Sequence, residues 1–211
     1  MATARSQAAA ADKRRLILDA AVRVFARSGF NGCRVSDIAD EAHVAYGLVY
    51  HYFRSKDEVL DTLFVERWNI LLEFIAETDM SEVAPREKLR AISAAIIDFY
   101  RYDPQLMKVI IVEVMRSANT FGLRHSDKIA KAYVLIGDIV SKAQEAGTFK
   151  REVSPRFAAL AFYGAIEQVL TGWIFGMLPE GEAEYEQAKA SIVETICGGL
   201  DEVSGRAARY V

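Results

Sequence analysis

Apolar positions recur along most of this chain at intervals of three and four residues, the period of a helix that buries one face. The first such stripe runs from about residue 12 to residue 28 and consists of Ile17, Ala20, Ala21, Val24 and Phe25. Gly29 follows where a left-handed residue commonly ends a helix. The dozen residues before the stripe contain nothing apolar enough to anchor them, and they are predicted to form a flexible arm.

Two very short helical patterns meet at a tight turn within residues 35–56, VSDIADEAHVAYGLVYHYFRSK. The spacing turns one set of side chains inward, namely Ile38, Ala39 and Ala42 from the first helix and Val49 and Phe53 from the second. The second helix turns three tyrosines and a histidine outward, in the set Tyr46, Gly47, Leu48, Tyr50, His51 and Tyr52. Paired short helices whose second member shows its outer side to a partner form a helix-turn-helix, so contact with DNA is predicted.

A long fourth helix is predicted from Lys56 to about Thr78, because Ser55 before it and Glu58 three residues later have the spacing of a capping box. Five further helical patterns follow, near residues 84–101, 103–117, 121–146, 154–178 and 183–203. Three prolines suit first helical positions, and two polar residues precede them as N-caps: Pro85, Asp103-Pro104 and Ser154-Pro155. No alternating strand pattern competes, so an all-α fold of about nine helices is predicted.

The helix predicted at 154–178 carries small residues along one stripe: Ala161, Ala165, Gln168, Gly172 and Gly176. Glycine inside a helix costs about 1 kcal/mol relative to alanine, so these positions need a packing reason. The final helix has a matching face of Ala188, Ile192, Ile196 and Gly199 with Val203. Two such helices crossing their counterparts about a two-fold axis form a four-helix interface, which predicts a homodimer; packing inside one subunit is the alternative.

The formal net charge of −3 conceals an uneven distribution. Residues 1–56 hold 9 Lys and Arg against 5 Asp and Glu, and the remainder holds 17 against 24, so the balances are +4 and −7. This asymmetry indicates an electropositive contact end on an acidic body. The basic N-terminus lacks the apolar run of a secretory signal, and the apolar stretch 157–178 has polar residues near its middle. With only Cys33 and Cys197, far apart, a cytoplasmic protein without a membrane span is predicted.

Residue types that carry out catalysis do not form the constellations that catalysis needs. The chain has no glycine-rich phosphate loop and no nucleophile elbow, and its histidines form no metal-ligand cluster: His43, His51 and His125. An enzyme, a metal and a cofactor are therefore not predicted. Three polar residues are expected in apolar surroundings, as hydrogen-bonded core groups or as contacts to a ligand: Glu113, Glu167 and Gln168.

Residues 29–60 carry a longer string of recognisable positions: Gly29-Phe30, Val35, Asp37-Ile38-Ala39, Ala42, Val44, Gly47, Tyr50, Tyr52-Phe53, Ser55-Lys56 and Leu60. This string resembles the head of the TetR family of bacterial transcriptional regulators. The resemblance implies a three-helix DNA-binding domain over residues 1–56 and a larger helical body over residues 57–211. It also implies that the body binds an effector and forms a homodimer through its last two helices.

Three positions depart from the family pattern. Arg34 stands where a threonine hydroxyl would cap the second helix. His43 takes the turn position usually filled by glycine, although histidine tolerates a positive φ less readily. Ala45 replaces a serine N-cap worth about 1 kcal/mol.

The resemblance implies which residues touch double-stranded operator DNA. Base-edge contacts are expected from Tyr46, Gly47 and Leu48, where glycine permits close approach and leucine can meet a thymine methyl. Phosphate contacts are expected from Tyr50, His51 and Lys56. The remaining candidate DNA contacts are Arg34, Ser36 and Ala45.

The body resembles the branch of regulators of fatty-acid degradation that respond to long-chain acyl-CoA. The resemblance implies a hydrophobic effector pocket lined by Trp68, Leu72, Phe99, Met107, Ile111, Met115, Tyr133, Phe162, Ile166 and Trp173. Candidate cations for CoA phosphates are Lys108, Arg116, Arg124, Lys128 and Lys131. The chain is expected to be a repressor released by such an effector. The alternatives are a regulator of drug efflux that senses other apolar compounds, and a helical-bundle acyl carrier or enzyme without DNA function.

Overall fold

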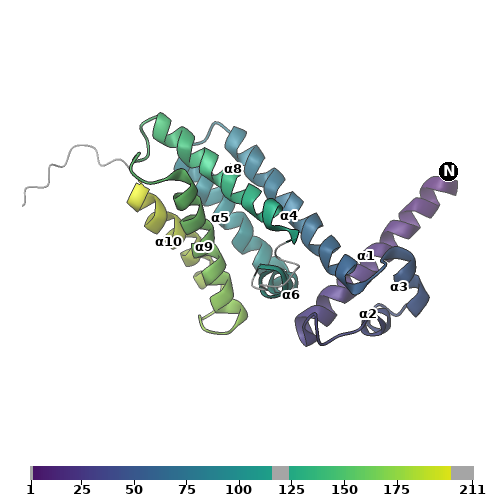
Figure 1. Cartoon of the computed structure of the whole chain (residues 1–211). Helices are drawn as coiled ribbons and strands as arrows, with labels where there is room; N and C mark the ends of the chain where they lie inside the picture. Colours follow the sequence, from purple (N-terminus) through teal and green to yellow (C-terminus); the bar gives the residue numbers. More distant parts are fainter. Residues whose placement is uncertain (1, 116–123, 201–211) are drawn as a thin grey trace, which may run out of the picture. The chain divides into compact units, whose positions relative to one another are not determined.

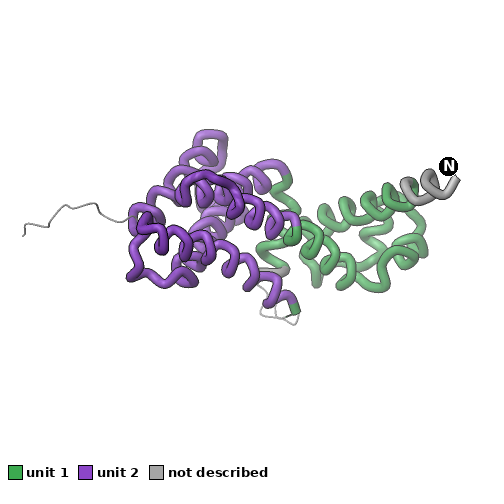
Figure 2. Tube along the Cα trace, turned by 90° about the horizontal axis from the view of Figure 1, so that it is seen from above, with its two compact units in different colours: residues 1–69, 103–124 green, residues 70–102, 125–211 purple. Residues whose placement is uncertain are grey.

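The computed structural model describes residues 2–115 and 124–200, and every regular element in those ranges is a helix. The all-α fold is thereby confirmed. Close packing divides the chain into two units, each built from two stretches of chain (Figure 2). The first unit comprises Met1–Asn69 with Asp103–Arg124, and the second comprises Ile70–Tyr102 with His125–Val211.

The first unit begins with α1 (Ala2–Ser28), which backs the two short helices α2 (Val35–Glu41) and α3 (Tyr46–Tyr52) (Figure 1). The apolar stripe of α1 is buried as predicted, and so are the inward positions of the short helices: Ile38, Ala39, Ala42, Val49 and Phe53. The start of α4 (Lys56–Met80), the short α6 (Pro104–Val109) and a π-helical turn, η1 (Ile110–Met115), complete this unit. The helix-turn-helix therefore packs on a buried apolar core to which α1, α4 and α6 also contribute.

The turn between α2 and α3 is closed by a left-handed histidine. His43 has φ 52°, and it is the one non-glycine residue with positive φ in the described ranges. The N–H of Val44 donates to the carbonyl of Ala39 at 3.0 Å, and that of His43 donates to Asp40 at 3.1 Å. These two bonds form a Schellman motif, the C-terminal closure that usually places glycine at the left-handed position. The predicted departure at His43 is thus a real backbone feature.

Helix starts follow the predicted signals with two differences. The N–H of Glu58 donates to the Ser55 hydroxyl at 3.2 Å, but the Glu58 carboxylate accepts from the N–H of Arg54 at 2.6 Å, one residue earlier than a capping box requires. Asp103 caps α6 by accepting from the N–H of Leu106 at 3.0 Å, as predicted. Ser154 occupies the N-cap position of α9 as predicted, but its side chain makes no cap bond.

Three predicted boundaries differ from the structure. The predicted flexible arm is helical from Ala2, since its alanines have the highest helix propensity. The helix expected at 103–117 is divided into α6 and η1. The helix expected at 154–178 ends at Ile174, because Gly176 adopts φ 64° in a second Schellman motif. Gly176 therefore stops the helix and does not continue the small-residue stripe.

The second unit combines the end of α4 with α5 (Pro85–Tyr102), α8 (Ser126–Glu145), α9 (Pro155–Ile174) and α10 (Glu182–Leu200). Its strongest pairings are α8 with α9 and α5 with α10. Helix α9 is long and apolar enough to cross a membrane, but half of its most apolar stretch is buried inside the unit, as in the core helix of a folded body.

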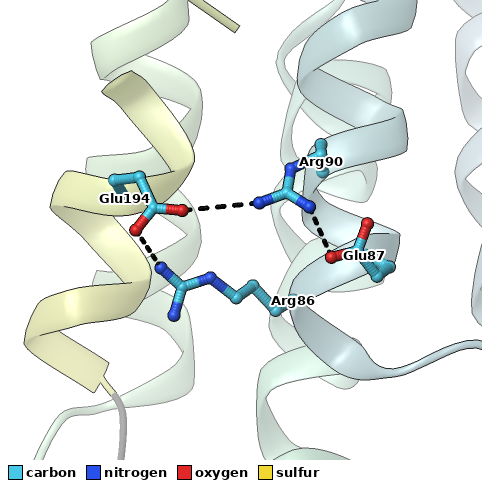
Figure 3. A network of polar contacts seen from close by, with 4 residues as sticks. All are labelled: Arg86, Glu87, Arg90 and Glu194. Atoms are coloured by element: carbon cyan, nitrogen blue, oxygen red, sulfur yellow. Dashed lines mark hydrogen bonds and ion pairs between the residues drawn. The ribbon is translucent and has the colours of Figure 1, made fainter. Parts of the chain in front are cut away.

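Ion pairs mark the contact between α5 and α10. Glu194 of α10 pairs with Arg86 and Arg90 of α5, and Arg90 also donates to Glu87 at 2.5 Å (Figure 3). Because the arginines and Glu194 lie at the surface, such pairs contribute about 0–1 kcal/mol each and chiefly fix the register of the two helices.

Candidate nucleic-acid interface and ligand-binding residues

Helix α3 is held by its buried side and turns an aromatic side outward. Val49 and Phe53 are buried to 1% and 2% exposure, whereas Tyr46 and Tyr50 are 53% and 43% exposed. A Cβ placed on Gly47 would meet nothing within 4 Å, so this glycine opens a gap in the outward surface at the helix start. The local sequence achieves this by placing the buried apolar residues four positions apart, on one side of the helix.

Tyr46 and Tyr50 act as a pair one turn apart. The Tyr46 hydroxyl donates to the Tyr50 oxygen at 3.2 Å, and the rings meet edge to face at 5.0 Å. Since the Tyr50 oxygen already accepts from Tyr46, its own proton is left to donate outward, which suits a phosphate oxygen.

The predicted DNA contacts separate by exposure. The exposed members of the set are Arg34, Ala45, Tyr46, Gly47, Tyr50 and His51. The half-buried members are Ser36, Leu48 and Lys56. Neither Arg34 nor Ala45 caps its helix through a side chain, although Asp37 accepts from the N–H of Arg34 at 2.7 Å and so retains half of a capping box.

Lys56 points back into its own unit. Its ammonium donates to the carbonyls of Phe30 and Cys33, the latter at 2.8 Å, and lies 4.4 Å from the centre of the Phe30 ring. Both carbonyls belong to the loop between α1 and α2, so Lys56 joins the start of α4 to that loop. Two of its three N–H groups are used in this way, which leaves one for a partner.

Charged side chains of α1 contact both short helices of the helix-turn-helix or the residues that end them. Arg23 donates to Glu41 at 2.7 Å and Arg27 does so at 3.2 Å, so two side chains of α1 bond to the last residue of α2. These hydrogen bonds, first that of Arg23, lower the pKa of Glu41. Arg14 lies 5.5 Å from the ring centre of Phe53.

Two bonds that no local pattern predicts join α6 and η1 to the end of α1 and the loop that follows it. The Glu113 carboxylate accepts from the N–H of Phe30 at 3.1 Å, and the Lys108 ammonium donates to the Ala26 carbonyl at 2.9 Å. Glu113 had been expected in apolar surroundings; it is half-buried and bonded to the chain. Gln168, the amide named with it, is exposed.

The predicted effector-lining residues fall in both units. In the first unit the buried ones are Trp68, Met107 and Ile111, whereas the Met115 side chain lies outside the described residues. In the second unit Leu72, Phe162, Ile166 and Trp173 are buried, and Phe99 and Tyr133 are half-buried. A packed core and a closed pocket both bury such side chains, so burial alone does not assign them.

Two of these residues have specific partners in the second unit. The Trp173 indole donates to the Pro179 carbonyl at 3.0 Å and stacks on Tyr100 at 5.5 Å, which fixes the turn after α9. Tyr133 meets the buried Tyr163 edge to face at 5.5 Å. Burial raises the pKa of both phenols, and the nearby Glu167 carboxylate raises it further. Among the predicted lining residues, Tyr133 therefore lies near the carboxylate of Glu167.

The cations proposed for CoA phosphates are placed as follows. Lys108 is bonded to α1, and Arg124 pairs with Asp61 at 3.6 Å. Lys131 is exposed, Lys128 is half-buried, and Arg116 lies outside the described residues.

The predicted dimer residues occupy surfaces of different kinds. Gln168 and Gly199 are exposed, and Ala161, Ala165 and Ile196 are half-buried, whereas Ile192 is buried in its own subunit. A Cβ on Gly172 would lie 2.4 Å from the Leu178 side chain, so packing within the chain already explains that glycine. Val203 lies outside the described residues. Large apolar side chains that the stripe did not include are exposed on α9, namely Phe157 at 67% and Leu160 at 43%.

Two family models together match most of the chain. The model described as bacterial regulatory proteins of the tetR family matches residues 17–63, the span of the helix-turn-helix and its backing. The model described as YsiA-like protein, C-terminal region, matches residues 64–203.

Similar proteins align with this chain over most of its length. The fatty acid metabolism regulator protein of Bacillus subtilis is 28% identical over 185 residues, which cover 87% of this chain and 93% of that protein. The crystal structure of the transcriptional regulator FadR from Bacillus subtilis in complex with stearoyl-CoA has a TM-score of 0.78 at 25% identity, covering 88% and 98%. SmeT, the repressor of a multidrug efflux pump of Stenotrophomonas maltophilia, has a TM-score of 0.74 at 19% identity, covering 90% and 91%, which shows the fold alone.

Proposed function

We propose that this chain acts as a cytoplasmic homodimeric repressor released by long-chain acyl-CoA. The chain belongs to the tetR family of bacterial regulatory proteins, and it is a ligand-responsive transcriptional regulator and not an enzyme. The observation that carries the DNA-binding part is the outward side of α3, where two tyrosines flank an open glycine on a helix fixed by a buried opposite side. Residues 1–56 are assigned to DNA contact and residues 57–211 to effector binding and dimerisation.

In this proposal α3 enters the major groove and its first turn reads bases. Gly47 brings the backbone close to the duplex, Tyr46 offers a hydroxyl, and Leu48 meets a thymine methyl. Tyr50 donates its free proton to a phosphate, with His51 beside it on the same exposed side. Arg34, Ser36, Ala45 and the remaining N–H of Lys56 serve the flanking backbone, where the charge balance of +4 over residues 1–56 favours phosphate.

The dimer is proposed to form through α9 and α10. The exposed Phe157 and Leu160 supply apolar area, and Gly164 and Gly199 have open space at the Cβ position that lets another helix approach. A two-fold dimer sets its recognition helices about one helical turn, roughly 34 Å, apart along the operator.

The effector is proposed to be a long-chain acyl-CoA because the similar Bacillus subtilis regulator was solved with stearoyl-CoA. The predicted lining residues of the second unit supply apolar surface for the acyl chain, and Tyr133 supplies a hydroxyl next to Glu167. Release requires that the ligand bind the DNA-incompetent state more tightly, since equal affinity for both states shifts nothing.

The test is fluorescence anisotropy of the purified full-length protein on a duplex from the promoter region of its own gene, over about 50–200 mM salt. Binding is expected to weaken steeply with salt and to weaken further with stearoyl-CoA but not with free CoA. The absence of salt-sensitive binding would refute the DNA assignment. Salt-sensitive binding that stearoyl-CoA leaves unchanged would refute the effector assignment alone.

Two substitutions test the contact surface. Gly47→Ala is expected to leave the melting temperature unchanged or raised, because the new Cβ meets nothing and alanine favours helix, yet to weaken operator binding because it blocks close approach. Tyr50→Phe is expected to weaken binding about tenfold by removing a hydrogen bond to a charged group. Tyr102→Phe is the matched control, since Tyr102 is 88% exposed in the second unit. Unchanged binding by both head variants would refute the proposed orientation of α3.

A further inference from the structure

A second concave site lies within the first unit, away from the outward side of α3. Side chains of α1, the first half of α4 and the start of α6 enclose a cleft of about 610 Å³. This volume is in the range of small-molecule sites, roughly 300–1,000 Å³. None of the candidate DNA-contacting residues lines it.

The floor of the cleft is aliphatic. It consists of Leu18 and Val22 from α1, Leu63 from α4 and Leu106 from α6, each exposed by 5% or less. Three helices thus contribute to one apolar surface, and a molecule that covers it would touch all three. The exposed lining of the cleft as a whole is mainly polar, so this floor offers a small apolar contact for the hydrocarbon part of a ligand.

The rim is charged, and most of its charges are already paired. Arg14 of α1 bonds to Glu66 of α4 at 2.7 Å and so bridges two walls of the cleft. Arg15 lies 4.0 Å from Asp19 on the same helix. The guanidinium of Arg23 is bonded to a carboxylate of α2 that does not line the cleft.

Arg67 differs from the other arginines of the rim. It is half-buried, lines the cleft from α4, and makes no ion pair or hydrogen bond with another residue of the described ranges. The last carboxylate of the rim, Asp103, caps α6 through its bond from the N–H of Leu106 and is not paired with Arg67. The cleft therefore combines an apolar floor with one guanidinium whose charge is not matched by a neighbour.

We infer that this cleft binds a small amphipathic organic anion, whose carboxylate or phosphate pairs with Arg67 while its apolar body covers the four aliphatic side chains. A planar guanidinium engages such oxyanions through two parallel N–H bonds, and partial burial strengthens the pairing. An occupant that touches α1, α4 and α6 together stabilises the packed form of the unit that carries α3, by mass action. None of the residues that line this cleft is among those proposed above for the operator or for acyl-CoA.

The experiment is methyl NMR of the full-length protein labelled at leucine and valine, titrated with octanoate and, separately, with neutral octanol. Octanoate is expected to shift the methyl resonances of Leu18, Val22, Leu63 and Leu106 with one common Kd. Arg67→Met, which keeps the aliphatic stem, is expected to weaken that Kd about tenfold or more, and octanol to bind comparably weakly. Arg156→Met, at an exposed arginine of the second unit, should leave the Kd within about twofold.

Several results would overturn the inference. Octanoate shifts confined to the second unit, for instance at Leu89 and Leu170, would place the ligand elsewhere. Equal Kd values for octanoate and octanol, or for wild type and Arg67→Met, would show that Arg67 does not pair with the ligand's carboxylate. If Arg67→Met changes the spectrum of the free protein, Arg67→Lys replaces it; that variant keeps the charge without the fork and is expected to bind with intermediate Kd.

Discussion

The left-handed turn between α2 and α3 allows a sharp test of the backbone at His43. Its φ of 52° places a side-chain-bearing residue where the Cβ crowds the following carbonyl, at about 1–2 kcal/mol. The exposed imidazole makes no hydrogen bond or ion pair with another described residue, so His43→Gly loses no such bond. Glycine is more flexible in the unfolded chain, and this entropy offsets about 0.4–1 kcal/mol of the stabilisation that relief of the strained φ provides. The net expectation is a stabilisation of about 0.5–1 kcal/mol.

Urea unfolding of the full-length protein, followed by circular dichroism, measures this difference. His43→Ala is the matched control because it removes the imidazole but retains the Cβ, and it is expected to be no more stable than wild type. In thermal unfolding the glycine variant should melt about 1–4 °C higher, given the size of the chain. If His43→Gly and His43→Ala are equally stable, the positive φ is not what costs energy at this turn.

Three further predictions concern the same unit. Lys56→Met removes the ammonium from two loop carbonyls and is expected to lower the free energy of unfolding by about 2 kcal/mol and to weaken operator binding; an unchanged unfolding midpoint would show that those bonds contribute nothing. Hydrogen bonds from α1 lower the pKa of Glu41 in the folded state, so the stability they provide is present above the unfolded pKa, near 4.5, and is lost as pH falls through the lower folded pKa. Wild type should therefore lose more stability than Glu41→Gln on acidification below about pH 4.5. Parallel pH profiles of the two proteins would contradict this. Glu113→Ala leaves the N–H of Phe30 without its acceptor and is expected to cost about 1–3 kcal/mol in urea unfolding, whereas Glu77→Ala at a solvated helical site should change little.

The sequence was sufficient for features that depend on neighbours along the chain. Apolar spacing located α1 to α5 and the inward residues of the helix-turn-helix, because a helical face is a property of three- and four-residue intervals. Asp103 was recognisable as an N-cap for the same reason, since its partner is three residues away. The positive φ at His43 followed from comparing one turn position with a family pattern.

Features that depend on residues distant in the chain could not be predicted. The bonds from Phe30 to Glu113 and from Lys108 to Ala26 join positions 83 and 82 residues apart, and no periodicity records such a meeting. The position of Lys56 was predictable, but the direction of its ammonium depends on where the α1–α2 loop lies. The end of α9 was misplaced because Met177 and Leu178 continue an apolar pattern after Gly176 has already turned the backbone.

The unit that carries α3 is assembled from two separate stretches of chain, and this has a consequence for exchanging parts between related regulators. A chimaera joined at residue 56 would remove Val59, Leu60, Leu63 and Phe64 of α4, all buried in this unit's core. It would also replace Glu113 and Lys108, which bond to the backbone of Phe30 and Ala26 in the retained part. A transplant that keeps its native recognition surface must therefore carry Met1–Asn69 together with Asp103–Arg124, as two grafts and not one.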